Sequence, residues 1–254
     1  MPVRVEISVE SAAGARIAER AGAARVELCS GLADGGLTPS AGLVEASAEL
    51  IETHVLVRPR PGDFRYTAEE IAVMVRDIEH ARAHGAAGVV VGALDASGAL
   101  APACQELVAA ADGLPVTLHR AIDVSADPVA VLDAAIAWGF ARVLTSGGAP
   151  TAVAGAEVIR ALAERAAGRL AVMACGGVRP NNARQVVAAT GVADLHAAPR
   201  TPTGTSGLGD VSFAGAGVPE GHDRFETDAA AVGALCELFR DPGSAAVAPE
   251  HGGS

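Results

Sequence analysis

Gly22-Ala-Ala-Arg-Val-Glu-Leu28, Gly85-Ala-Ala-Gly-Val-Val-Val91, Gly139-Phe-Ala-Arg-Val-Leu-Thr145 and Gly191-Val-Ala-Asp-Leu-His-Ala197 share one pattern. In each segment a glycine is followed by a short link and then by an apolar run. A glycine that adopts the left-handed conformation ends a helix, and the apolar run has the composition of a buried strand in a parallel sheet. Four copies of this pattern indicate that helices and strands alternate along the chain.

The same alternation, followed over the whole chain, predicts eight strands. The segments between them, such as 67–84 and 127–138, have the spacing of apolar residues typical of helices. A chain of 254 residues is also close to the roughly 250 residues of a typical eightfold barrel. The predicted fold class is therefore α/β, a single (β/α)8 barrel. A doubly wound sheet is disfavoured because no GxGxxG follows the first strand. The expected strands lie near 3–9, 25–29, 53–60, 88–94, 115–121, 142–146, 169–175 and 194–198.

The domain organisation follows from this count. We expect one barrel domain over residues 1–240. Residues 199–226 are rich in glycine and proline, which predicts a long loop that covers the site, and 228–240 reads as the closing helix. Residues 241–254 contain small and polar residues that bury too little area to offset the entropy of ordering, so we expect a disordered C-terminal tail.

Composition and charge exclude several function classes. A net charge of -11 and an aromatic content of 3% argue against nucleic acid as a partner. No run approaches the ~20 apolar residues of a membrane span, and the first ten residues resemble a strand, so we expect a cytoplasmic protein with no membrane partner. The 19 basic residues are all arginine, which excludes mechanisms that need a lysine amine. The four cysteines contain no CxxC pair and predict neither disulfides nor a zinc ribbon.

Polar residues gather where the predicted strands end, which is where barrels of this type carry their reactive groups. Because side chains alternate along a strand, we expect three pairs on common faces: Glu27 with Cys29, Arg58 with Arg60, and His119 with Asp123. Inward-facing charges need partners, so Glu27 and Arg58 are candidates for a structural ion pair as well as for function. Catalytic candidates, if the protein is an enzyme, are Glu27, His119 and Asp123. The full set at the strand ends is Glu6, Glu27, Cys29, Arg58, Arg60, Asp95, His119, Arg120, Asp123 and His196.

Two glycine pairs follow predicted strands six and seven. Bare backbone N–H groups at such positions bind anions, and barrels often hold a substrate phosphate near the loops after strands seven and eight. Arginines such as Arg60 or Arg179 would add a bidentate contact. The alternative is that the glycines only permit tight turns. The anion-binding candidates are Arg58, Arg60, Ser146, Gly147, Gly148, Gly176 and Gly177.

Several segments together resemble one known family, the CutC family. These segments are 25–29 (RVELC), 35–40 (GGLTPS), 58–60 (RPR) with 62–64 (GDF), 119–123 (HRAID) and 142–148 (RVLTSGG), and the resemblance runs from about residue 3 to 198. It implies a (β/α)8 barrel and a homo-oligomer, a dimer or a tetramer. It also implies cytoplasmic copper handling, with Cu(I) held on Cys29, which matches the family's cysteine motif.

Two hypotheses from different classes therefore remain open, and the sequence does not decide whether the protein is an enzyme. One is a copper-homeostasis protein that binds Cu(I) through Cys29, with His or Met partners or the same cysteine of a second subunit. The other is an enzyme that acts by acid–base chemistry on a small anionic substrate, phosphorylated or carboxylated. Arginines and carboxylates suit anions and proton transfer, whereas hard ligands suit Cu(I) poorly. A third interpretation is a hard divalent ion on Glu27, Asp123 or His196.

Overall fold

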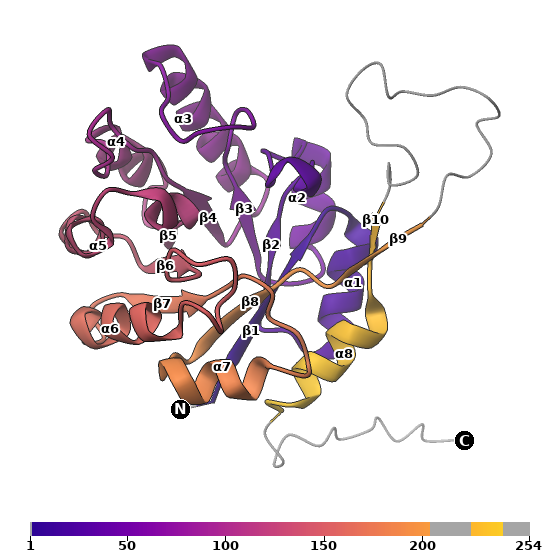
Figure 1. The fold of residues 1–254 in the computed structure, drawn as a ribbon. Coiled ribbons are helices and arrows are strands. Elements are labelled where there is room, and N and C mark those ends of the chain that lie inside the picture. The colour runs from indigo at the N-terminus through magenta and orange to yellow at the C-terminus, as the bar shows by residue number, and fades with distance from the viewer. Residues whose placement is uncertain (1, 204–224, 241–254) are drawn as a thin grey trace, which may run out of the picture.

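The computed structural model describes residues 2–203 and 225–240, and its centre is a closed barrel of eight parallel strands (Figure 1). Each strand pairs with the next along the chain, and the eighth pairs with the first. All eight predicted strands are present, so the predicted fold class is confirmed. The strands are β1 (Arg4–Val9), β2 (Arg25–Leu28), β3 (Thr53–Leu56), β4 (Gly88–Val91), β5 (Val116–Leu118), β6 (Arg142–Thr145), β7 (Ala171–Ala174) and β8 (Asp194–Ala197).

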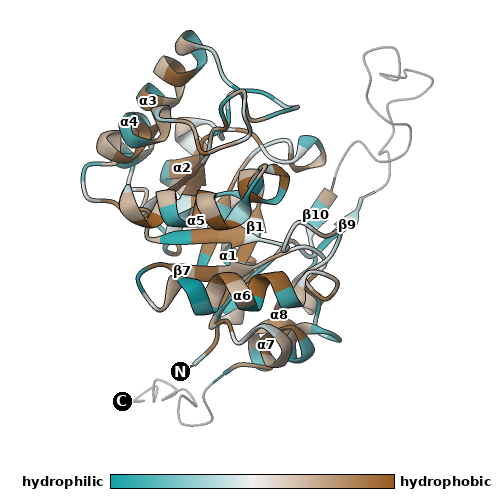
Figure 2. Cartoon of the chain, turned by 60° about the vertical axis from the view of Figure 1, so that its left-hand side comes forward, coloured by the Kyte–Doolittle hydropathy of each residue, from teal (hydrophilic) through white to brown (hydrophobic). Residues whose placement is uncertain are grey.

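Helices surround the barrel and cover its outer face (Figure 1). Their surfaces mix hydrophobic and hydrophilic residues, as α5 and α6 show in Figure 2, because one face packs on the strands and the other meets solvent. The closing helix predicted over 228–240 is present as α8, which packs beside α1. The helices are α1 (Ala12–Ala21), α2 (Ala41–Ala48), α3 (Ala68–Ala83), α4 (Ala103–Ala110), α5 (Pro128–Ala137), α6 (Ala156–Ala166), α7 (Ala183–Thr190) and α8 (Ala229–Glu237).

The helix ends have the chemistry that the sequence predicts. Gly22 has φ 79° and donates its backbone N–H to the carbonyls of the last turn of α1. The equivalent glycine after α7, Gly191, has φ 72°. Only glycine takes this left-handed conformation without a steric penalty, so the chain turns sharply into the next strand. Helix starts are capped as well, most completely in α3, where Thr67 and Glu70 form a reciprocal capping box.

Inside the barrel, one layer is charged instead of apolar. Arg25 donates to Glu6 at 2.5 Å and to Asp194 at 3.2 Å, and all three side chains are buried. The strand register explains the contact, because Glu6 lies directly beside Arg25 on β2 and beside His196 on β8. Buried charges of opposite sign satisfy one another there, and this ion network forms the floor below the mouth of the barrel.

Seven of the eight strands end before their predicted last residue, and in β3 and β5 this changes which side chains share a face. β3 stops at Leu56 because Pro59 and Pro61 cannot donate to a continuing sheet. β5 stops at Leu118, and residues 120–124 form a short 3-10 helix that the His119 side chain caps. The period-two argument therefore fails for Arg58 with Arg60 and for His119 with Asp123, since all four residues lie beyond the ends of these strands.

The last part of the chain is described only in part. β9 (Arg200–Pro202) and β10 (Phe225–Thr227) form an antiparallel pair within the predicted covering loop. Residues 204–224 of that loop and the predicted tail, 241–254, lie outside the described residues. No helix in the described ranges is long and apolar enough to span a bilayer.

The buried ion network yields a stability prediction. Arg25→Met removes the buried cation that Glu6 and Asp194 share, so we expect the free energy of unfolding to fall by about 3–5 kcal/mol. Arg4→Met is the control, because Arg4 also contacts Asp194 but its side chain is 51% exposed. This control should cost less than about 1 kcal/mol. Urea unfolding followed by circular dichroism measures both variants, and an equally small loss in each would contradict the role given to Arg25.

Candidate functional site

A cavity of about 350 Å³ lies at the end of the barrel where the strands have their carboxyl ends. This size is within the range of small-molecule sites. Its wall combines carboxylate, imidazole, guanidinium and bare backbone groups contributed by residues at or after six different strands. The lining residues that bear on chemistry include Glu27, Arg58, His119, Gly176, Gly177 and His196.

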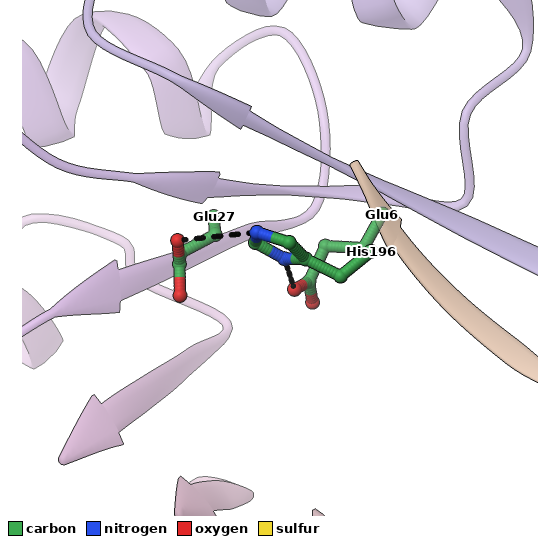
Figure 3. Close-up of side chains that lie close together, drawn as sticks. All are labelled: Glu6, Glu27 and His196. Atoms are coloured by element: carbon green, nitrogen blue, oxygen red, sulfur yellow. Dashed lines mark hydrogen bonds and ion pairs between the residues drawn. The ribbon is translucent and has the colours of Figure 1, made fainter. Parts of the chain in front are cut away.

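An imidazole lies between two carboxylates, those of Glu6 and Glu27 (Figure 3), and His196 and Glu27 line the cavity. His196 Nδ1 lies 2.8 Å from Glu6 Oε1, and its Nε2 lies 3.8 Å from Glu27 Oε2. Because Glu6 accepts at Nδ1, the ring presents Nε2 toward Glu27. The Ser8 hydroxyl donates to Glu27 at 3.1 Å, since these two residues are register neighbours on β1 and β2.

The environments of the two carboxylates push their pKa values apart. Burial raises the pKa of Glu6, but the hydrogen bond from His196 and the charges of His196 and Arg25 outweigh it and hold the pKa at about 2. Burial, together with the charge of Glu6, raises the pKa of Glu27 despite the attraction of His196. The pKa of His196 is raised: burial lowers it, but Glu27 and Glu6 favour the charged ring. Glu6 is therefore ionised, while the pKa values of Glu27 and His196 are both raised and depend on each other's charge.

His119 lines the opposite part of the mouth, after β5, and is 4% exposed. Its Nδ1 accepts the backbone N–H of Ala121 at 3.2 Å, and its ring packs 4.6 Å from the Phe64 ring. Burial and the charge of Arg58 lower the pKa of His119 to about 3. The imidazole is consequently neutral at physiological pH and is a poor base.

Arg58 is held in place by backbone oxygens. Its guanidinium donates to the carbonyls of Asp34, Gly36 and Gly62 at 2.8 to 2.9 Å. It has no carboxylate partner among the described residues, so its positive charge remains uncompensated beside the cavity. The ion pair of Arg58 with Glu27 that the sequence left open is not formed.

Three further arginines line the cavity, and only two of them have a carboxylate partner. Arg120 pairs with Asp123 at 2.8 Å and Arg200 with Glu10 at 3.6 Å. Arg179 has no carboxylate partner in the part of the chain that the structure describes. Glu27 is the one acidic residue among those that line the cavity, so the cavity favours an anion.

Backbone groups add to this preference. Gly176 and Gly177 follow β7 with φ 93° and 69° and line the cavity. Their N–H groups donate to no acceptor within the described residues. Successive unpaired backbone N–H groups of this kind form a concave binding surface for anions. These two glycines are thus the predicted anion-binding residues that the fold brings to the cavity together with Arg58.

Other predicted residues lie outside the cavity. Arg60 is on the surface, where it contacts Glu70 at 2.6 Å and Asp63 at 3.1 Å. The Asp123 carboxylate accepts from the side chains of Thr145, Ser146 and Arg120 and from the backbone of Ser146 and Gly148, which leaves it little capacity as an acid or base. Burial alone would raise the pKa of Asp123, but these hydrogen bonds outweigh burial, so the pKa of Asp123 is lowered. The Ser146, Gly147 and Gly148 loop therefore closes around Asp123 instead of lining the cavity.

A metal ion has one candidate ligand set among the described residues. Ligand atoms of Glu6, Glu27 and His196 all lie within 4.8 Å of one another. Asp123, which the sequence also suggested as a ligand for a hard divalent ion, is not in this set. Glu6 is already engaged by Arg25 and by His196 Nδ1, so only Glu27 and Nε2 of His196 are left to contact a ligand in the cavity.

Cys29 is fully buried and does not line the cavity. Its Sγ lies 3.8 Å from the Ser8 hydroxyl and 3.8 Å from the Val9 carbonyl, and the side chain packs with Leu56 and Val90. Burial, reinforced by the negative charge of Glu27, raises the pKa of the thiol. Cu(I) binds the thiolate and needs a second soft ligand, so the residues around Cys29 do not fit this ion.

Two residues that complete the site were not assigned this role from the sequence. The sequence places Glu6 at a strand end without linking it to His196, and it suggests His196 only as a metal ligand. The signal that relates them is the strand register, because Glu6 and His196 are lateral neighbours on β1 and β8. A spacing of 190 residues in the chain conceals this contact until the barrel is closed.

The fold and the cavity define the chain as a (β/α)8 barrel with an arginine-lined site at the carboxyl ends of its strands. The chain belongs to the CutC family, whose model matches residues 3–201. A family protein CutC from Agrobacterium fabrum is 42% identical over 91% of this chain and 92% of its own length. Another family protein CutC, from Xanthomonas campestris pv. campestris, is 47% identical over 78% of this chain and 84% of its own length.

Solved structures agree with this assignment. The CutC protein of Streptococcus agalactiae, named as a candidate copper homeostasis protein, superimposes with a TM-score of 0.73 at 32% identity over 76% of this chain and 97% of that one. Phosphoribosylanthranilate isomerase from Thermotoga maritima superimposes with a TM-score of 0.54 at 13% identity, over 92% of this chain and 97% of that one. The second likeness shows the fold alone.

The burial of the cysteines yields a prediction about reactivity. At pH 8 the native protein should show no thiol that reacts with a disulfide reagent within minutes, because all four cysteines are buried and burial raises their pKa values. In urea all four should react. A fast reaction of one thiol in the native protein, absent from Cys29→Ser, would show that Cys29 is more accessible than the structure indicates.

Proposed function

We propose that this protein is an enzyme that acts by acid–base chemistry on a small anionic substrate bound at the mouth of the barrel. The observation that carries the proposal is the combination, in one cavity, of uncompensated positive groups with a carboxylate–imidazole pair. Arg58, Arg179 and the amides of Gly176 and Gly177 supply the positive side, and Glu27 with His196 supplies the proton-transfer side. Phosphate or carboxylate is the anionic group expected.

Glu27 and His196 divide the proton-transfer work. Glu6 stays ionised and holds Nδ1 of His196, which fixes the ring and leaves Nε2 to give or take a proton. Glu27 has a raised pKa and lines the cavity, where a substrate can reach it. When His196 is protonated, Glu27 is the ionised carboxylate that accepts a proton from the substrate. Glu6 is a positioning residue in this scheme, because it acts through His196.

Copper handling is the second candidate function, and the observation in its favour is the name of the solved Streptococcus agalactiae relative. In this form the protein would take Cu(I) as cargo on Cys29, and the burial of that thiol requires the surrounding strands to open first. A cytoplasmic location, where the free cysteines stay reduced, and assembly into a dimer or tetramer belong to the proposal under either function.

Anion binding gives the first test of the proposal. Inorganic phosphate, titrated by calorimetry, should bind the wild-type protein, and Arg179→Gln should weaken the affinity about tenfold because it removes an uncompensated cation from the cavity. Arg60→Gln is the matched control, since Arg60 is partly exposed and paired with acidic residues outside the cavity. Loss of affinity in Arg60→Gln, or no effect of Arg179→Gln, would place the anion elsewhere.

Turnover gives the second test. Phosphorylated and carboxylated metabolites that raise the melting temperature of the wild type should be incubated with it, and their conversion followed by NMR. Glu27→Gln should still bind the compound but lose at least about a hundredfold in rate, which is typical of a missing general acid or base. Cys29→Ser should keep full activity. Unchanged turnover in Glu27→Gln, or tight Cu(I) binding that only Cys29→Ser abolishes, would contradict the enzyme proposal.

A further inference from the structure

Among the buried side-chain atoms that have no hydrogen-bond partner at the mouth of the barrel, one belongs to an imidazole. Nε2 of His119 makes no hydrogen bond, although the side chain lines the cavity and is 4% exposed. An unsatisfied donor or acceptor in such a position costs free energy, and native structures retain one where a ligand completes it. The same side chain is held rigidly, which is a second and independent observation.

Three neighbours fix the His119 ring. The backbone N–H of Ala121 donates to Nδ1, and the ring of Phe64 packs against one face. On the side of β4, Gly92 leaves room for the ring, because a Cβ atom built at Gly92 would lie 2.6 Å from His119 Cε1. The ring can therefore neither rotate freely nor move away from the cavity.

The hydrogen bond at Nδ1 also determines which nitrogen carries the proton. Since Nδ1 accepts, the neutral ring bears its proton on Nε2, so the unpartnered atom is a donor. Arg58 is the charged group that acts on the ring, and it disfavours a second proton. A neutral, fixed N–H donor is suited to an oxygen that gains negative charge during a reaction.

We propose that His119 donates Nε2–H to the carbonyl oxygen of the substrate, and that the substrate class is a small phosphorylated aldehyde or ketone. This inference rests on the proposed function, because it assigns the anionic group to the cavity amides and the base to Glu27. Beyond the proposed function, it adds a carbonyl group on the substrate and His119 as the residue that recognises this group.

The reaction that this arrangement supports is removal of a proton from the carbon next to the carbonyl. The C–H bond breaks and its proton passes to the Glu27 carboxylate. The electron pair forms a carbon–carbon double bond, and the carbonyl π electrons move onto the oxygen, where the His119 Nε2–H stabilises the negative charge. Return of the proton to the same carbon re-forms the original carbonyl compound. Where that carbon carries a hydroxyl group, transfer of the hydroxyl proton to the other oxygen lets the carbon-bound proton return to the former carbonyl carbon and gives the isomeric carbonyl compound, so the step needs no oxidant, reductant or co-reactant.

The test compares probes that differ at the proposed contact. Dihydroxyacetone phosphate carries a carbonyl group where glycerol 3-phosphate carries a hydroxyl group. Inorganic phosphate has no carbon chain and therefore has neither group. The wild type should bind dihydroxyacetone phosphate at least about fivefold more tightly than glycerol 3-phosphate, as expected for one added hydrogen bond. His119→Asn retains an acceptor for the Ala121 N–H but lacks the Nε2 donor, so it should lose this preference and keep its affinity for inorganic phosphate. His119→Gln, which offers an amide N–H near the position of Nε2, should recover part of it.

A measurement on the wild type keeps the inference testable if the variants do not fold. Nitrogen-15 NMR should show one histidine, assigned by its absence in His119→Asn or by contacts to Phe64, that stays neutral with its proton on Nε2 from pH 5 to 8. Equal affinity for the two carbon probes, a preference that persists in His119→Asn, or protonation of His119 above pH 6 would each overturn the inference. Binding of inorganic phosphate without any carbonyl preference would leave the proposed function intact, whereas no binding of phosphate would remove the proposed function itself.

Discussion

The structure of the site depends on the buried carboxylate of Glu6. It accepts from Arg25 at 2.5 Å and lies 2.8 Å from His196 Nδ1, so it joins the ion network inside the barrel to the groups that face the cavity. Both neighbours are set by strand register, because Arg25 and His196 lie beside Glu6 on the two adjoining strands. A protein that buries a carboxylate in this way must balance its charge, and here the balancing cation and imidazole also orient the reactive pair.

Much of the fold could be predicted from the sequence because its signals are local. A glycine that must adopt a positive φ at a helix end, followed by an apolar run, can be recognised without knowing the contacts, as Gly22 and Gly191 show. The early end of β5 could not be predicted in this way. It depends on the His119 side chain capping a 3-10 turn, which competes with continuation of the strand only once the surrounding loops are placed.

The site was predicted less completely than the fold. Glu27, His119, Arg58 and the glycines after β7 do line the cavity, because residues at strand ends must meet there in a closed barrel. Arg60 and Asp123 are similar in type but engage local partners, and the difference is decided by loop geometry. The cavity therefore has excess positive charge next to Glu27 and His196. Cys29 is buried near Leu56 and does not line the cavity.

A crystal structure of the reduced protein grown with both inorganic phosphate and Cu(I), with anomalous data collected at the copper edge, tests the central claim most directly. The account predicts phosphate in the cavity, in contact with the N–H groups of Gly176 and Gly177, and no anomalous peak at Cys29. A copper peak about 2.3 Å from Cys29 Sγ, with no phosphate in the cavity, would contradict it and would establish the metal-binding function instead.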